Sequence, residues 1–406
     1  MKVVVVGGGA SGLIAAYAAA KNGHDVTLLE KNEKLGKKIY ITGKGRCNLT
    51  NDCLPDEFLQ NVVRGEKFLR GVIYKFPPAK LMELLEENGL PLKTERGNRV
   101  FPVSDHASDV TKILEKMCRE AGVSIKLNEQ VVKIGVLQST MSDITTQNGT
   151  FPCDAAVIAT GGISYPSTGS TGDGYAFAKE FGHKIVPCLP SLTGLNCKGD
   201  FSAVQGLSVK NAVLTTRRGD KVIFSELGEL LFTHYGISGP LVLTLSALIN
   251  RLPLNEISLS LDFKPALDEK QLDERLLRDF AERKNEQMKN VIRGLLPASL
   301  GGFVLKAAQV SPEKQANAVT KEERLRLLKA LKGLFLAPVS LRGFEEAVVT
   351  SGGVSLDGIN PKTMESKLVK RLYFCGEVLD LDAFTGGFNL QIAFATGFAA
   401  GNGISD

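Results

Sequence analysis

Residues 3–30, VVVVGGGASGLIAAYAAAKNGHDVTLLE, decide the fold of this chain. Four consecutive valines are typical of a parallel strand that is buried on both faces. The glycine-rich turn that follows leads into an alanine-rich segment over residues 13–22, which predicts a helix that Gly23 ends. The segment HDVTLLE then predicts a second strand that finishes at Glu30. The order strand, turn, helix, strand predicts a β-α-β unit in a parallel sheet.

The turn fits the pattern G-x-G-x-x-G with Gly7, Gly9 and Gly12. The first glycine permits the tight turn, the second lets the backbone approach a pyrophosphate, and the third allows the helix to pack close to the strand. The N-terminus of that helix offers free N–H groups to phosphates. Glu30 stands where a carboxylate accepts hydrogen bonds from an adenosine ribose, and its charge disfavours a 2′-phosphate. These residues predict a dinucleotide site that does not take NADP.

The composition is that of an ordinary globular protein and argues against several classes. A chain of 406 residues predicts two or three domains. The formal charge of +5 arises from mixed acidic and basic residues, so we expect no nucleic-acid partner. We expect no membrane partner either, because no apolar run is long enough to cross a bilayer. Seven scattered cysteines and four separated histidines argue against disulfides and a metal site, and favour a cytoplasmic protein.

Two later segments favour FAD over NAD. Residues 153–162, CDAAVIATGG, predict a strand that runs into a glycine pair. Residues 371–401 predict another strand, an acidic loop, the pair Gly386-Gly387 and a final apolar helix. An FAD enzyme needs such a return to the nucleotide site, because the ribityl chain and the isoalloxazine ring extend beyond the pyrophosphate. The last helix, starting near Asn389, would direct its positive end at the pyrimidine edge of the flavin. The alternative is that the glycine pair only marks a loop.

In these features the sequence resembles the glutathione-reductase-like FAD fold, and more closely a bacterial flavoprotein family that includes aminoacetone oxidase and a bile-acid Δ4,6-reductase. The matching stretches are GGGASGL (7–13), GKKIYITGKGRCNLTN (36–51), ATGGISYPSTGSTGDGYAFAKEFGH (159–183), LLFTHYGISGP (230–240) and GEVLDLDAFTGGFNLQIAFATG (376–397). The resemblance implies an α/β fold in which a Rossmann-like FAD-binding domain of the glutathione-reductase type carries an inserted β-rich domain with a helical subdomain. From the motifs and the resemblance, the expected cofactor-binding residues are Gly7, Gly9, Ala10, Ser11, Gly12, Glu30, Lys31, Lys37, Lys38, Gly45, Arg46, Cys47, Asn48, Val131, Ala159, Thr160, Gly161, Gly376, Glu377, Asp380, Gly387, Asn389, Leu390 and Gln391.

The segment over residues 36–51 is rich in glycine and in basic residues. By resemblance it lies beside the FAD, with its glycine-rich end near the isoalloxazine ring. Its glycines let the backbone pass close to a ligand. Lys37, Lys38 and Arg46 can face the pyrophosphate, a reduced-flavin anion or a substrate carboxylate. The alternative is a solvated basic loop. A redox role for Cys47 is disfavoured, because no second cysteine is near it in sequence.

The middle of the chain predicts two insertions. From about Cys188 to Phe263, short β-like runs separated by Gly, Asn, Asp and Pro predict an antiparallel sheet or barrel. Charged residues with helical spacing follow, and Thr320 with Glu323 predicts a capping box. Pro338 to Val349 returns to strand-like character. The expected organisation is an FAD-binding domain at 1–187 and 350–406, a β-rich substrate domain at 188–265 and 334–349, and a helical insertion at 266–333. A substrate pocket at the domain interface follows from this division.

Few residues outside the cofactor motifs are candidates for chemistry. Flavin supplies the hydride transfer, so a proton donor or an anion anchor near the ring would suffice from the protein. The candidate catalytic residues are Arg46, His234, Tyr235 and Tyr165. His234 can act as an acid or base near neutral pH, and the tyrosines can donate hydrogen bonds. A structural role is the alternative for each. The sequence holds a single G-x-G-x-x-G motif in a β-α-β pattern, so NADH, if used, would bind directly against the flavin.

These features favour an FAD-dependent oxidoreductase that acts on a small organic substrate. The resemblance implies NADH-dependent reduction of an enone-type C=C bond in a bile-acid or steroid-like compound, or oxidation of a small amine or ketone by O2. Two other classes stay open: a flavoprotein that modifies tRNA, and a redox sensor that uses FAD without turnover. The sequence leaves the substrate, the electron donor and the oligomeric state undetermined.

Overall fold

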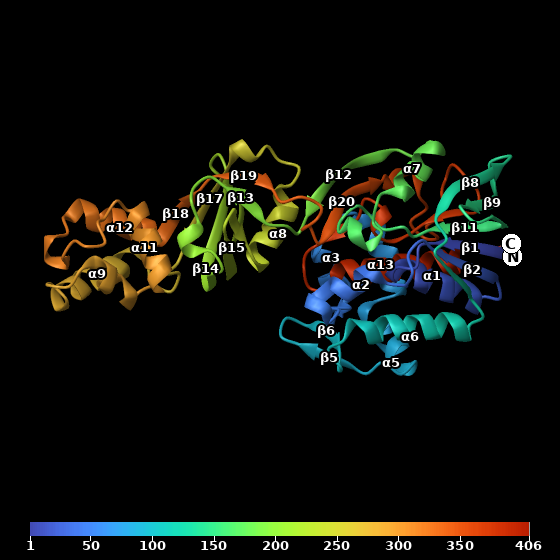
Figure 1. The fold of residues 1–406 in the computed structure, drawn as a ribbon, viewed down its shortest axis with the longest axis horizontal. Helices are drawn as coiled ribbons and strands as arrows, with labels where there is room; N and C mark the ends of the chain where they lie inside the picture. The colour runs from blue at the N-terminus through green and yellow to red at the C-terminus, as the bar shows by residue number, and fades with distance from the viewer. Residues whose placement is uncertain (406) are drawn as a thin grey trace. The chain divides into compact units, whose positions relative to one another are not determined.

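A computed structural model describes residues 1–405 and divides them into two compact units (Figure 1). The first unit combines Met1–Ser191 with the C-terminal part of the chain from Gly343 onward, and the second comprises Leu192–Arg342. Each unit has its own hydrophobic core. No helix among the described residues is long and apolar enough to cross a membrane.

A five-stranded parallel sheet forms the centre of the first unit. Its strands, in spatial order, are β21 (Leu372–Phe374), β11 (Ala155–Ile158), β1 (Lys2–Val6), β2 (Asp25–Glu30) and β7 (Ser124–Leu127). β1 lies in the middle, and Val3–Val6 are buried because strands flank β1 on both sides and other elements cover both faces. The predicted α/β, Rossmann-like fold is confirmed.

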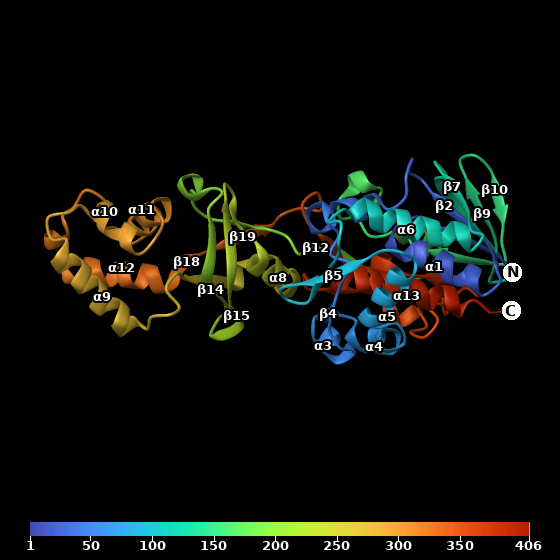
Figure 2. The same ribbon diagram turned by 90° about the horizontal axis from the view of Figure 1, so that it is seen from below.

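Three helices pack together beside this sheet (Figure 2). They are α1 (Ala10–Lys21), α6 (Ala107–Glu120) and α13 (Phe388–Gly403), and α1 contacts both of the others. The α1–α13 contact is close enough to require small residues: a Cβ added at Gly397 or Gly401 would overlap the backbone oxygen of Ser11 or Ala15. The first and last helices of the chain therefore form one packed pair, which brings the C-terminal motif to the N-terminal glycine turn.

The remaining elements of the first unit are small. The helices are α2 (Lys37–Ile41), α3 (Pro55–Gln60), α4 (Glu66–Lys75), α5 (Pro78–Glu87) and α7 (Asp173–Glu180). The short sheets are β10 (Thr150–Pro152)–β9 (Thr140–Thr146)–β8 (Val131–Leu137), β3 (Thr50–Asn51)–β6 (Arg99–Pro102)–β5 (Leu92–Glu95), β12 (Ile185–Ser191)–β20 (Val349–Val354) and β22 (Asp382–Ala383)–β4 (Val62–Arg64). The last two pair segments that lie far apart in sequence, and they carry polar residues of the site described below.

The second unit is built on a seven-stranded antiparallel sheet. Its spatial order is β18 (Leu334–Leu336), β17 (Ile257–Asp262), β14 (Ser208–Arg218), β15 (Lys221–Thr233), β16 (Gly236–Ser238), β13 (Leu195–Cys197) and β19 (Pro338–Leu341). The two edge strands are consecutive in the chain and are separated by Ala337 alone, so the sheet curls back on itself. The predicted antiparallel sheet or barrel is thus present. The strand-like character predicted up to Val349 is interrupted, because residues 342–348 lie outside any strand.

The helices of the second unit are α8 (Pro240–Ile249), α9 (Glu269–Glu282), α10 (Met288–Val291), α11 (Ala298–Ala307) and α12 (Lys321–Gly333). The predicted capping box begins α12: Thr320 accepts from Glu323 N at 3.2 Å, and the Glu323 carboxylate accepts from Thr320 N at 2.8 Å. Asp268 and Gln271 form a second capping box at the start of α9.

Candidate functional site

The turn between β1 and α1 has the geometry that its glycines predict. Gly7 has a positive φ of 107°, and a Cβ there would lie 2.5 Å from the carbonyl oxygen of Ala159. A Cβ at Gly12 would overlap the carbonyl oxygen of Gly7. At Gly9 an added Cβ would meet no described atom within 4 Å, and no side chain in the described part of the chain caps α1 there. An open space in front of a bare helix N-terminus fits a pyrophosphate group.

Glu30 lies at the carboxyl end of β2 and is 7% exposed. One carboxylate oxygen accepts from Gly8 N at 2.7 Å, and the other accepts from the backbone and side-chain nitrogens of Asn32. These bonds fix the carboxylate beside the glycine turn, where the sequence predicts a ribose. The nearby predicted lysines have protein partners: Lys31 pairs with Asp173 at 2.7 Å, and Lys37 pairs with Glu33 at 2.8 Å.

The segment over residues 36–51 ends against the N-terminus of α13. The Asn48 side chain accepts from Gly387 N at 3.0 Å and donates to the carbonyl oxygens of Thr50 and Val100. Thr50 Oγ1 donates to Gln391 Oε1 at 2.9 Å, and a Cβ at Gly387 would overlap Thr50 O. Asn389 is held in turn by three hydrogen bonds to the backbone of residues 383–384. The structure therefore brings two of the predicted cofactor segments together at one helix terminus, where the N–H groups carry partial positive charge.

A second polar cluster joins Lys38 to the strand pair β12–β20. Lys38 Nζ lies 2.6 Å from one Glu377 oxygen, and the other Glu377 oxygen accepts from Thr350 N at 2.8 Å. The Thr350 hydroxyl accepts from the backbone nitrogens of Ile163 and Ser164, at 2.9 and 3.1 Å. This network fixes the chain just after the predicted glycine pair Gly161-Gly162.

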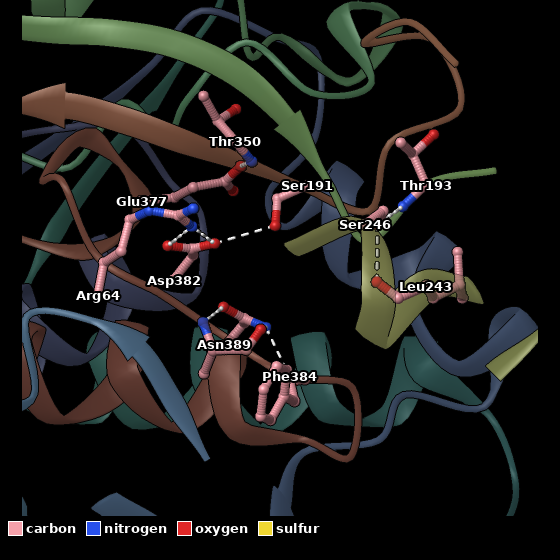
Figure 3. Close-up of polar contacts among 11 residues, drawn as sticks. Arg64, Ser191, Thr193, Leu243, Ser246, Thr350, Glu377, Asp382, Phe384 and Asn389 are labelled. Carbon is pink, nitrogen blue, oxygen red and sulfur yellow. Dashed lines mark hydrogen bonds and ion pairs between the residues drawn. The ribbon is translucent and has the colours of Figure 1, made fainter. Parts of the chain in front are cut away.

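A third cluster centres on Asp382, which is fully buried (Figure 3). Arg64 Nη1 lies 2.8 and 2.7 Å from its two oxygens, and Ser191 Oγ donates to it at 2.9 Å. Burial raises the pKa of the Asp382 carboxyl, and the Arg64 guanidinium opposes that rise. In Figure 3 Asp382 lies between Arg64 and Ser191, with Glu377 and Thr350 on one side and Asn389 on the other. The sequence singled out neither Arg64, Ser191 nor Asp382.

Comparison with known proteins gives the family. The family described as HI0933-like protein Rossmann domain matches residues 1–403. The 3-dehydro-bile acid delta(4,6)-reductase of Clostridium scindens is 32% identical over 412 residues, covering 100% of this chain and 99% of that protein. The ribosomal RNA dihydrouridine synthase of Haemophilus influenzae is 29% identical over 409 residues, covering 99% and 98%. This chain belongs to the HI0933-like family of FAD-dependent Rossmann oxidoreductases.

A solved structure agrees with the fold of this HI0933-like flavoprotein. The 3-ketosteroid-Δ4-(5α)-dehydrogenase of Rhodococcus jostii RHA1 superposes with a TM-score of 0.55 at 16% identity, covering 99% of this chain and 96% of that one. At this identity the likeness concerns the fold alone. The predicted family resemblance and the prediction of a flavoprotein oxidoreductase are confirmed.

Arg46 of this flavoprotein is surrounded by acidic side chains. Its guanidinium pairs with Glu95 and with Asp105, at 2.6 Å from the latter, and stacks 4.2 Å from the Phe101 ring centroid. Lys93 also pairs with Asp105. The Arg46 hydrogen bond lowers the pKa of Glu95, and bonds from Lys93 and then Arg46 lower that of Asp105. The predicted positive charge at Arg46 is therefore balanced by two carboxylates, and its role toward cofactor or substrate stays a prediction.

Cys47, next to Arg46, has a fully buried thiol whose pKa burial raises to about 12. A thiol of this kind is a poor nucleophile at neutral pH. Burial therefore disfavours a redox role for Cys47. The backbone φ of Cys47 is 59°, and Gly43, Lys44 and Gly45 in the same loop also have positive φ values.

The other predicted catalytic residues lie in both units. His234 and Tyr235 form the turn between β15 and β16 in the second unit, with ring centroids 5.0 Å apart, and the Arg342 guanidinium lies 4.3 Å over the Tyr235 ring. Tyr165 belongs to the first unit, where its N–H donates to Phe344 O at 2.9 Å and burial raises the pKa of its phenol. Their catalytic roles stay predictions.

The remaining predicted cofactor residues lie near the carboxyl ends of the parallel strands, with one exception. Ala159, Thr160 and Gly161 follow β11, and Gly376, Glu377 and Asp380 follow β21. Val131 instead begins β8 in the three-stranded sheet, where it pairs with Thr146. Carboxyl ends of parallel strands are where α/β sheets bind ligands, so the positions of the first six fit the predicted cofactor.

Proposed function

We propose that this flavoprotein reduces a C=C bond conjugated to a carbonyl group in a small organic substrate. One observation supports the proposal. Two kinds of protein are similar to this chain over nearly its whole length, and the names of both describe reduction of such a bond. A 3-dehydro steroid with Δ4,6 double bonds has those bonds conjugated to its 3-carbonyl. Dihydrouridine is uridine whose C5–C6 bond, conjugated to the C4 carbonyl, has been reduced. An enone or similar acceptor is therefore the substrate class that both names support.

The proposed roles of the site residues follow from their placement. The Gly7–Gly12 turn and the α1 N-terminus would bind the pyrophosphate of FAD, and Glu30 would bind the ribose. The N-terminus of α13 would face the pyrimidine edge of the flavin, with Asn48 and Gln391 both hydrogen-bonded to Thr50 beside it. Lys38 and Glu377 would lie along the ribityl chain. Bound FAD supplies the hydride that such a reduction needs, and the protein binds and orients the two reactants.

We infer that NADH is the electron donor and binds directly against the flavin. The chain has one G-x-G-x-x-G motif, and the parallel sheet that carries it is assigned to FAD. The proposed compartment is the cytoplasm, where the seven cysteines, all free among the described residues, would stay reduced.

The test is the anaerobic visible spectrum of the purified protein with FAD. We expect NADH to bleach the flavin band and 2-cyclohexenone or 4-androstene-3,17-dione to restore it, with a saturated ketone produced. If an amine or ketone reduced the flavin and O2 alone restored its band, the protein would instead be an oxidase. If the protein did not bind FAD, both the assigned cofactor and the proposed function would be contradicted.

The second candidate is reduction of uracil in RNA, and a charge difference between the two units favours it. Residues 192–342 contain 22 Lys and Arg against 16 Asp and Glu, whereas the rest of the chain contains 27 against 28. All of the net positive charge thus belongs to the second unit. Ribosomal RNA dihydrouridine synthases are similar to this chain at 29% and 28% identity. Salt-dependent binding of a ribosomal RNA transcript, followed by assay for dihydrouridine, would establish this candidate.

A further inference from the structure

The side chain of Asn32, two residues after Glu30, has hydrogen-bond partners that only one orientation of its amide can satisfy. Its Nδ2 donates to Glu30 Oε1 at 2.6 Å and to the carbonyl oxygen of Thr168 at 3.3 Å. Its Oδ1 accepts from Lys37 Nζ at 3.2 Å. Exchanging the two atoms would place Oδ1 against a carboxylate and a carbonyl, and the NH2 group against an ammonium group. The charges around the amide therefore fix its donor toward Glu30.

The backbone that carries this amide is anchored as well. Glu30 O accepts from Glu129 N at 2.9 Å, and Asn32 O accepts from Asn128 N at 3.1 Å. Both bonds come from the segment that follows β7, the strand paired with β2. Asn32 N also donates to Glu30 Oε1, at 2.8 Å. Asn32 thus holds one oxygen of the Glu30 carboxylate from a fixed backbone, through two donors.

The hydrogen bonds of the Glu30 carboxylate leave one of its oxygens with acceptor capacity. A carboxylate has about four acceptor positions, two on each oxygen. Both donors of Asn32 bond Oε1, whereas Oε2 accepts one bond from the described residues, from Gly8 N at 2.7 Å. One residue further on, a Cβ added at Gly9 would meet no described atom within 4 Å. The remaining acceptor position is therefore on the oxygen that bonds the glycine turn, next to open space.

We propose that Asn32 is a positioning residue, which holds the Glu30 carboxylate so that Oε2 accepts a hydrogen bond from the adenosine ribose of FAD. This inference rests on the proposed function, in which FAD is the cofactor, and it deepens the adenosine end of that site. Asn32 acts through Glu30 and does not itself bind the ribose. Hydrogen bonds to an ionised acceptor are stronger than those between neutral groups. An acceptor that is already oriented loses less freedom when a ligand binds.

The test begins with three single variants. Asn32→Ala removes the side-chain donor without adding charge. Asn32→Asp keeps the shape of the side chain but puts a carboxylate where the donor faces Glu30. The matched control is Asn22→Ala, which removes an exposed asparagine at the end of α1 whose Nδ2 donates to Asn402 Oδ1 at 3.0 Å. Urea denaturation of each apoprotein establishes first that the variant is folded.

FAD affinity is then measured by fluorescence titration of the apoproteins. We expect Asn32→Ala to bind FAD about tenfold more weakly than wild type, because the carboxylate loses its side-chain donor. Asn32→Asp should lose at least as much, since like charges repel, and Asn22→Ala should match wild type. A side chain that only fills space would be replaced well by the equally shaped aspartate. FAD affinity of Asn32→Asp within about threefold of wild type would therefore overturn the inference.

Two further measurements ask whether Asn32 acts through Glu30. In the Glu30→Ala background there is no carboxylate to position, so Asn32→Ala should weaken FAD binding there by less than about threefold. An FAD analogue whose adenosine lacks the ribose 2′-hydroxyl gives the same information with Glu30 intact. We expect wild type to prefer FAD over this analogue about tenfold, and Asn32→Ala to prefer it less than about threefold. An equal loss in both backgrounds, or an unchanged preference, would contradict a positioning role.

Enone reduction, assayed separately with wild type saturated with FAD, distinguishes this inference from the proposed function. If 2-cyclohexenone does not reoxidise the reduced wild type while Asn32→Ala still weakens FAD binding as expected, the proposed function fails and the role of Asn32 stands. If wild type reduces the enone and both Asn32 variants bind FAD as wild type does, the role of Asn32 fails and the proposed function stands.

Discussion

Two glycine-rich segments of the first unit, the turn at residues 7–12 and the loop at residues 42–47, use glycine for different physical reasons. In the turn, a Cβ at Gly12 would overlap the backbone of Gly7, so glycine is required by close packing. In the loop, Gly43, Lys44, Gly45 and Cys47 have positive φ, and a Cβ at Gly45 would have its nearest neighbour at 3.9 Å. At Gly45 glycine thus relieves backbone strain rather than a collision, whereas a Cβ at Gly43 would also lie 2.8 Å from Asn48 N.

The two segments differ in charge as well. The turn carries no charged residue and presents backbone N–H groups, whereas the loop carries Lys44 and Arg46. Arg46 is paired with carboxylates from another part of the chain. The comparison teaches that a bare backbone turn can indicate a phosphate site more directly than a basic loop, because side-chain charges can be balanced by distant residues.

The largest effect is expected from Gly12→Ala. The added methyl group would collide with backbone that cannot move without separating α1 from β1, so we expect the free energy of unfolding to fall by about 3 kcal/mol. Urea denaturation measures this. The matched control is Gly9→Ala, where the methyl group has open space and φ is −84°. That variant should keep its stability and lose about tenfold in FAD affinity, since the methyl group takes the space of the pyrophosphate. Unchanged FAD binding by Gly9→Ala would place the pyrophosphate elsewhere.

A smaller effect is expected from Gly45→Ala. An alanine in the left-handed region costs about 1–2 kcal/mol, without a steric collision. Urea denaturation of this variant should therefore show a loss clearly below that of Gly12→Ala. Gly149→Ala is the control, because Gly149 has neither positive φ nor a neighbour within 4 Å of an added Cβ among the described residues. Equal losses for Gly12→Ala and Gly45→Ala would remove the distinction between collision and strain.

Arg46→Gln should affect FAD binding little, because the guanidinium is engaged by Glu95 and Asp105. Fluorescence titration of the apoprotein with FAD measures the affinity. Lys93→Gln, which removes the other cation of the same network, is the control. An affinity lowered about tenfold or more by Arg46→Gln alone would restore the cofactor role that the sequence predicted for this residue.

The smallest effect is expected for the pH dependence of the stability that the ion pairs of Arg46 with Glu95 and Asp105 contribute. Cationic partners depress the pKa values of Glu95 and Asp105 below their ordinary values of 4.5 and 3.8. Their stabilising contribution is therefore complete above those ordinary values and is lost as pH falls through the depressed ones. We expect the difference in melting temperature between wild type and Arg46→Gln to be present at neutral pH and to shrink below about pH 4. A difference in melting temperature that stays constant across this range would show that protonation of Glu95 and Asp105 does not weaken their pairing with Arg46.

Much of the fold could be predicted because its signals are local. The valine run, the G-x-G-x-x-G spacing and Glu30 lie within 28 residues and specify β1, α1 and β2. The Thr320–Glu323 capping box was predictable for the same reason. The strand character assigned to residues 342–348 was wrong, because β-propensity over a short stretch does not say whether a partner strand is available.

The site was predictable in part. The sequence singled out Glu377 and Lys38 through their motifs, but their mutual ion pair spans 339 positions and has no local signal. Asp382 lay in the predicted acidic loop, but the sequence analysis selected Asp380 from that loop and not Asp382. Arg64 and Ser191 stand outside every motif, so only their convergence on Asp382 reveals them.

The sequence by itself determined the nucleotide-binding turn, the β-α-β unit that carries it and the presence of a β-rich insertion with helices. These follow from backbone sterics and hydrophobic periodicity, which act between neighbours in the chain. The tertiary structure alone decided which charges are paired with which: Arg46 is balanced by Glu95 and Asp105, and Arg64 is paired with a buried aspartate 318 positions away. The physical reason is that Coulomb interactions and burial depend on distance in space, and folding brings together residues that the sequence separates.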